Sequence, residues 1–220
     1  MKAKKSEVKK LLLERDYDKL CDLEHRSGGV LRLLRSVAYD REELVFWRAI
    51  EAAGHLTNFM AKTNPEGVRN FLRRLIWALS DESGDMAWSG PEMLAEIFIR
   101  NPVLCEDIAP IVINLDEPVF RKGAVWAAGR IASDYPEIVQ EVSEDLINEI
   151  DNPDPETKAY AAWALGCLGD KRAEKHLKRL TSDTTPDEVK FYSDGKLKKV
   201  KVSAVAKEAL EKIESSEENS

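Results

Sequence analysis

A helical segment rich in small residues recurs along this chain of 220 residues, and the repetition limits the folds open to it. Its copies align on an anchor position, with a small residue five positions before it, a second small residue two positions before it in four of the five copies, and an aliphatic residue two positions after it. The anchors are Gly54, Ala95, Gly129 and Gly166, with a less complete fifth copy centred on Glu211. A glycine inside a helix costs about 0.5–1 kcal/mol relative to alanine, so its return at three anchors indicates a packing demand. The sequence therefore predicts an all-α protein, an α-solenoid of about five helical pairs.

Second helices are expected between the repeated segments, each opened by an Asn or Asp cap. They cover residues 64–80, 101–114, 134–150 and 170–181. Near the C-terminus, two alternating runs flank Asp194-Gly195, the dipeptide typical of a two-residue hairpin turn. We predict a single repeat domain over residues 1–213, a small β-hairpin insertion over 187–201 and a disordered tail over 214–220.

The clearest copy, from Thr157 to Asp170, ends in Leu-Gly-Cys-Leu-Gly-Asp, and Phe120-Arg121 repeats its apolar-basic opening. This pattern resembles the HEAT-like repeats named after phycobilisome lyases. The resemblance covers residues 41–213 and implies a fold but no particular chemistry. Residues 80–92 read SDESGDMAWSGPE, which is similar to an S-D-E-S-G-x-x-x-W-x-x-P-E motif of uncharacterised HEAT-repeat proteins from anaerobic prokaryotes.

Four tryptophans share the register of the repeat. Trp47 and Trp88 lie seven residues before their anchors, and Trp126 and Trp163 lie three before theirs. Positions that differ by four lie on one side of a helix, so a row of rings about 30 Å long is expected. Aromatic residues at helical spacing are more often core, and that alternative stays open.

The resemblance implies which positions face the concave groove: seven, six and three before the anchor, and one after it. The predicted binding residues on this face are Trp47, Arg48, Glu51, His55, Trp88, Ser89, Glu92, Glu96, Lys122, Trp126, Arg130, Tyr160 and Trp163. The charges among them have two interpretations, inter-repeat ion pairing and a groove with an acidic and a basic part. The small and aliphatic core positions are expected on another side of these helices.

The acidic loop Asp81–Asp85 also has two interpretations. It is a capped entry to the following helix, or it positions Trp88 and Glu92 at the groove or binds a cation. Its carboxylates lack the spacing of a calcium loop, so no metal site is predicted. The edge of the hairpin either caps the solenoid or pairs with another chain.

The expected function is noncatalytic binding of a protein or peptide in the groove. The alternatives are an enzyme that resembles a DNA alkylation-repair glycosylase or a bilin lyase, since both use aromatic grooves. No catalytic residue and no cofactor are predicted, because no nucleophile–base pattern or phosphate-binding loop is readable. A net charge of −7 argues against a nucleic-acid partner. The lack of a long apolar run predicts a cytoplasmic protein without a membrane span, and the sequence does not predict its oligomeric state.

Overall fold

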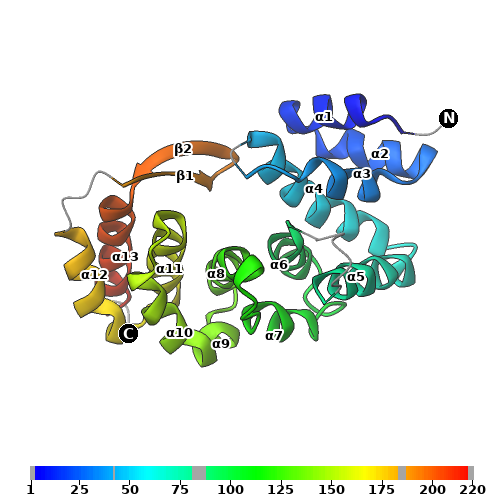
Figure 1. The fold of residues 1–220 in the computed structure, drawn as a ribbon. Coiled ribbons are helices and arrows are strands. Elements are labelled where there is room, and N and C mark those ends of the chain that lie inside the picture. The colour runs from blue at the N-terminus through cyan, green and yellow to red at the C-terminus, as the bar shows by residue number, and fades with distance from the viewer. Residues whose placement is uncertain (1–2, 42, 81–87, 183–186, 218–220) are drawn as a thin grey trace. The chain divides into compact units, whose positions relative to one another are not determined.

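The computed structural model describes residues 3–41, 43–80, 88–182 and 187–217 (Figure 1). Its contacts divide the chain into two compact units, Met1–Ala109 and Pro110–Ser220, and each unit is considered by itself. The single domain over 1–213 stays a prediction. The predicted class is confirmed: the structure is mostly helical, with HEAT-like helical repeats and a small antiparallel hairpin near the C-terminus.

Unit 1 is built around one long helix, α4. Its helices are α1 (Lys5–Glu14), α2 (Tyr17–Ser27), α3 (Val30–Val37), α4 (Leu44–Ala61), α5 (Pro65–Leu79) and α6 (Gly90–Arg100); α7 (Ile108–Ile113) spans the division between the units. Helices α1, α2, α3, α5 and α6 all contact α4. Helix α5 begins as the sequence predicts, because the Asn64 side chain accepts a hydrogen bond from the Gly67 amide at 2.9 Å and Pro65 occupies the first turn.

The helix predicted over residues 101–114 is shorter in the structure. Regular α-helix begins only at Ile108, after a series of turns. Asn101 ends α6 instead of opening the next helix. Its buried side-chain amide donates hydrogen bonds to Thr57 Oγ1 at 3.2 Å and to the Ile97 carbonyl at 3.0 Å, which hold the side chain against α4 and α6.

Unit 2 continues the repeat. Its helices are α8 (Pro118–Ala132), α9 (Pro136–Val139), α10 (Ser143–Asn148), α11 (Pro155–Leu168), α12 (Glu174–Thr181) and α13 (Val202–Glu217), with 3-10 turns at Gln140–Val142, Glu149–Asp151 and Lys171–Ala173. Helix α11 packs against both α8 and α13. The helix predicted over 134–150 is thus divided into short pieces. Helix α13 runs through Glu217, so the predicted start of the tail at 214 is wrong, and residues 218–220 lie outside the described part.

The hairpin consists of β1 (Glu188–Ser193) and β2 (Lys196–Lys201), paired antiparallel. Asp194 and Gly195 both have positive φ angles, 52° and 75°, as a type I′ turn requires. Phe191 is buried and holds β1 against α11, its ring centroid lying 5.5 Å from those of Tyr160 and Trp163. The local sequence pattern therefore predicts this element correctly.

Candidate functional site

The first two repeats place eight of the predicted binding residues together in unit 1. They come from α4 and from the start of α6: Trp47, Arg48, Glu51, His55, Trp88, Ser89, Glu92 and Glu96. We call this set the α4–α6 face. The two helices approach closely because Gly54 has no side chain: a Cβ there would lie 2.7 Å from the Glu96 carbonyl oxygen. The anchor glycine thus allows α4 and α6 to approach closely at Glu96.

Glu92 is the most buried charge on this face, with 0% of its surface exposed. Arg41 donates to its Oε1 through Nε at 2.9 Å and through Nη2, while Oε2 has no hydrogen-bond partner among the described residues. The same Nη2 donates to the Trp88 carbonyl at 3.3 Å, and the guanidinium lies 5.7 Å from the centre of the Phe46 ring. Arg41 therefore ties the segment before α4 to the start of α6. Removing one partner of such a buried pair strongly destabilises a protein.

Trp88 lies in a turn and not on a helix, which corrects its predicted register. Helix α6 begins at Gly90, with Pro91 in its first turn, where a proline is well tolerated because its missing N–H is not needed. The indole of Trp88 is 39% exposed. Its backbone carbonyl is held by Arg41, so the turn has a fixed point next to the ring.

Trp47 belongs to the core, and the prediction that it lines an open groove is wrong. Only 1% of its surface is exposed. Its Nε1 donates to the Arg41 carbonyl at 2.9 Å, and its ring meets Phe46 edge to face with centroids 5.0 Å apart. Trp47 therefore fixes the backbone of the residue that holds Glu92.

Glu51 joins α4 to the preceding helices. Arg15 Nε donates to it at 3.2 Å and the Tyr17 hydroxyl at 2.5 Å, and the Tyr17 ring lies 4.7 Å from that of His55. Burial raises the pKa of Tyr17 and lowers the pKa of His55. These contacts give Glu51 a structural partner that the sequence does not reveal.

Arg48 and Glu96 are also engaged within unit 1. Arg48 Nη1 donates to the Leu12 carbonyl at 3.2 Å and to the Leu13 carbonyl, at the end of α1. Glu96 is buried beside Arg100, whose Nε lies 3.5 Å from its carboxylate, and Ser89 is buried as well.

The carboxylates of the α4–α6 face therefore lie beneath guanidinium groups. The covering residues Arg15, Arg41 and Arg100 are all at least partly exposed. The groups of this face that reach solvent are the guanidinium groups of these three arginines, the half-exposed imidazole of His55 and the indole of Trp88. Arg100 was readable in the sequence as the i,i+4 partner of Glu96, whereas Arg15 and Arg41 come from distant segments without a local signal.

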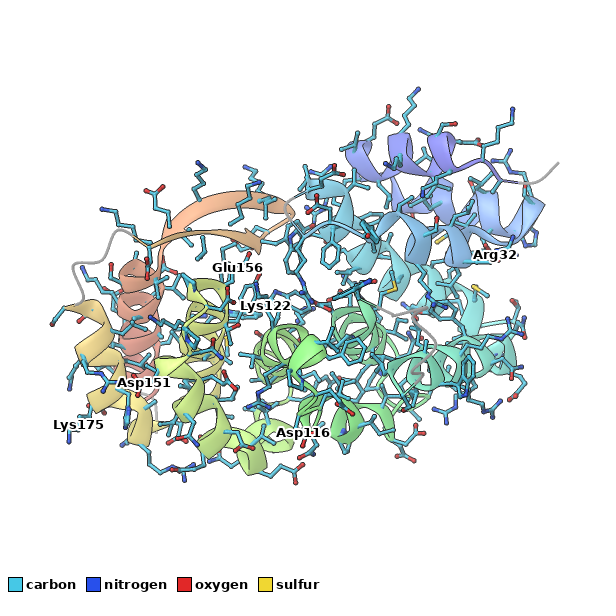
Figure 2. All side chains as sticks on the ribbon, viewed as in Figure 1. Arg32, Asp116, Lys122, Asp151, Glu156 and Lys175 are labelled. Atoms are coloured by element: carbon cyan, nitrogen blue, oxygen red, sulfur yellow. The ribbon has the colours of Figure 1, made fainter. Side chains whose placement is uncertain are left out.

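In unit 2 the predicted charges have local partners. Lys122 on α8 and Glu156 on α11 point toward one another in Figure 2, with Nζ 2.7 Å from Oε2 and 3.1 Å from Asp154 Oδ2. Burial alone would lower the pKa of Lys122, but the two carboxylates outweigh it and raise that pKa. Arg130 pairs with Asp134, one turn further on, at 2.8 Å.

The predicted aromatic residues of unit 2 form a packed cluster. Trp126 and Tyr160 are buried, so their prediction as exposed groove residues is wrong. Trp163 is half-buried, 6.1 Å from Trp126 and edge to face with Phe191 on the hairpin. The physical reason is the tight packing of α8, α11 and β1, which encloses rings that a single helix would leave exposed.

The acidic loop Asp81–Asp85 lies outside the described residues, so its interpretations stay predictions. Within 3–41, 43–80, 88–182 and 187–217, no three His, Cys, Asp or Glu side chains are grouped so as to hold a metal ion. In the same ranges, no helix combines the length and the apolar character that crossing a bilayer demands. Burial raises the pKa of Cys21 and of Cys105 to about 11, which disfavours their thiolates.

The stacked helices and the closely packed anchors define a helical-repeat protein, and comparison with known proteins agrees. The family described as HEAT repeats matches residues 106–192. An uncharacterised protein of Archaeoglobus fulgidus is 33% identical over 179 residues, which is 79% of this chain and 91% of that protein. The chain belongs to the same family as this archaeal protein, and the HEAT-repeat match covers residues 106–192 of this chain.

Two of the solved structures that are similar in fold are designed proteins. A designed armadillo repeat protein matches with a TM-score of 0.55 at 20% identity, over 95% of this chain and 92% of that chain. A second, solved in complex with the peptide (KR)4, matches with a TM-score of 0.53 at 18% identity, over 96% of this chain and 100% of that chain. Identities this low show the fold alone.

Proposed function

We propose that this protein is a noncatalytic scaffold that binds an extended segment of a partner protein on the α4–α6 face. The observation that carries the proposal is the setting of Trp88. Its indole is 39% exposed, while the polar groups around it are held by Arg41 and Glu92. A large aromatic ring on a fixed backbone loses little freedom on binding, and tryptophan is enriched among the residues that dominate binding energy.

The fold supports this proposal. Designed armadillo repeat proteins of the same fold include one solved with the peptide (KR)4 and others described as designed for modular peptide recognition. Repeat proteins of this kind offer long surfaces on which an extended chain can lie. For this chain we propose the same mode of binding, without assigning it the same peptide.

The enzyme alternatives have less support. A glycosylase-like reaction needs a carboxylate that reaches the substrate, and Glu92 is fully buried and engaged by Arg41. A bilin-lyase-like groove needs open aromatic walls, and Trp47, Trp126 and Tyr160 are buried. These observations favour a binding role.

Three narrower statements belong to the proposal. The repeats are of the phycobilisome-lyase type, residues 80–92 form a motif shared with HEAT-repeat proteins of anaerobic prokaryotes, and the protein works in the cytoplasm. Composition and the local pattern support them. These statements support the binding proposal less strongly than the exposure of Trp88 does.

The test compares two tryptophans of unit 1. Peptides are selected from a displayed random library on the full chain, and their affinities are measured by fluorescence polarisation. Trp88→Ala should weaken the selected peptides at least about tenfold, which corresponds to about 1.4 kcal/mol. The matched control is Trp77→Ala, which removes a 68% exposed indole from α5. Equal affinity for the wild type and Trp88→Ala, or a larger loss in Trp77→Ala, contradicts the proposal.

A further inference from the structure

The hairpin is a cationic element in an acidic protein. Its strands contain Lys190, Lys196, Lys198, Lys199 and Lys201, against only Glu188 and Asp194 in the same segment, while the whole chain has a net charge of −7. The hairpin therefore has a local surplus of positive charge in a chain whose net charge is negative.

The lysines of β2 are exposed and lack carboxylate partners. Lys196, Lys198, Lys199 and Lys201 have no ion pair within the part of the chain that the structure describes. Carboxylates of a partner would therefore supply counter-charge to these four lysines.

The hairpin is held in place by its other side chains. Val189 and Phe191 are buried. Strand β1 contacts α11 and β2 contacts α13, and Figure 1 shows the hairpin beside these helices. The opposite face has the half-buried pair Tyr192 and Leu197. A partner on that face would thus meet a fixed strand with both apolar and cationic side chains.

The outer edge of β2 has no neighbouring strand among the described residues, since the sheet contains only β1 and β2. A two-residue turn is closed by a hydrogen-bonded pair, here Ser193 and Lys196, and such pairs alternate along an antiparallel ladder. By that alternation Lys199 directs its backbone N–H to the open edge. The outward backbone groups of this edge can therefore form a ladder of hydrogen bonds with an added strand.

We propose that β2 is a docking edge for an extended acidic segment of a partner protein, which adds as a strand and places its carboxylates against the lysines. Lysines on an edge strand normally prevent pairing with other chains. The same lysines favour an acidic segment over other segments, because only its carboxylates form favourable charge pairs with them. A nucleic acid fits less well, since it makes no backbone ladder and is repelled by the net charge of the chain. This edge belongs to unit 2, whereas the α4–α6 face belongs to unit 1.

The probe is a short fluorescein-labelled peptide of alternating Glu and Val, titrated with the full chain by fluorescence polarisation. Lys198→Glu with Lys199→Glu should weaken binding at least about tenfold. The matched control reverses the same number of charges elsewhere in unit 2, through Lys175→Glu with Lys207→Glu, and should bind like the wild type. Lys199→Pro should weaken binding more than Lys199→Gln, because both remove the charge and only proline removes the outward N–H.

Circular dichroism and thermal unfolding check that each variant is folded, and the charge-reversal pair tests the edge even if Lys199→Pro does not fold. Three results would overturn the proposal. The first is equal affinity in the hairpin and control variants. The second is tighter binding of single- or double-stranded DNA than of the peptide. The third is self-association in sedimentation that Lys198→Glu with Lys199→Glu abolishes, which would make a second copy the occupant.

Discussion

The indole of Trp163 lies where a side chain at Gly129 would have to be. A Cβ added at Gly129 would approach Cε3 of Trp163 to 2.6 Å and Cα of Ala164 to 3.2 Å. Gly129 is the anchor of α8, and Trp163 lies three residues before the anchor of α11. The two recurring features of the sequence, glycine and tryptophan, are therefore two sides of one inter-helix contact in unit 2.

Gly129→Ala should lower the free energy of unfolding by about 1–3 kcal/mol, because the added methyl group overpacks this contact. The same substitution should cost clearly less in a Trp163→Ala background, where the ring is gone. Urea denaturation of the four proteins of this cycle measures the difference. An equal loss in both backgrounds would show that the ring does not require the glycine.

Gly166→Ala should behave differently, because the obstacle is backbone. A Cβ at Gly166 would lie 2.6 Å from Cα of Ala209 on α13 and 2.7 Å from its Cβ. Replacing Ala209 by glycine removes only the second contact, so Ala209→Gly should restore at most part of the lost stability. Complete rescue, measured by thermal unfolding, would contradict this packing.

Much of the fold could be predicted from local sequence. The anchor glycines indicate close helix packing, which Gly54, Gly129 and Gly166 all make, and Asp194-Gly195 indicates the hairpin turn. Even the position of Trp88 outside the helix was readable, since Gly90-Pro91 marks a helix start. Local chemistry decides each of these features.

The candidate site was less predictable, because its partners lie far apart in the chain. Arg41 reaches Glu92 across 51 residues and Arg15 reaches Glu51 across 36. Helical periodicity places a side chain on one face of a helix, but neighbouring helices decide whether that face is open. For this reason three residues that the repeat register predicts to be exposed are in fact buried, namely Trp47, Trp126 and Tyr160.

Trp47→Ala should lower the free energy of unfolding much more than Trp88→Ala, because Trp47 lies in the core and Trp88 at the surface. Truncation of the buried Trp47 should lower the free energy of unfolding by about 3–5 kcal/mol, since it leaves a cavity and removes the hydrogen bond to the Arg41 carbonyl. Truncation of the partly exposed Trp88 should change it by no more than about 1 kcal/mol. Comparable losses in chemical denaturation would contradict the burial of these two rings.

Asp170 should make stability fall in acid. It is buried and accepts hydrogen bonds from Ser143 Oγ, from the Arg172 amide at 2.9 Å and from Arg172 Nη2 at 2.7 Å. Burial alone would raise the pKa of Asp170, but the bonds from Arg172 and Ser143 outweigh it and lower that pKa. Its contribution is therefore complete above its unfolded pKa of about 3.9 and is lost as the pH falls through the folded value.

Asp170→Asn should accordingly lower the free energy of unfolding at pH 7 by about 1–3 kcal/mol. The gap between variant and wild type should narrow as the pH falls below about 4. Urea denaturation across this range checks it. A gap that is constant with pH would mean that the carboxylate charge is not involved.

The central claim, that Trp88 is the contact with a partner segment, is tested most directly by 19F NMR of the chain labelled with 5-fluorotryptophan. The five tryptophans give separate probes, assigned by substitution, and a selected peptide is then added. The resonance of Trp88 should shift or broaden with the peptide, while those of Trp77 and the buried Trp47 keep their positions. A shift confined to Trp77, or no shift at Trp88 when the peptide is bound, would contradict the account.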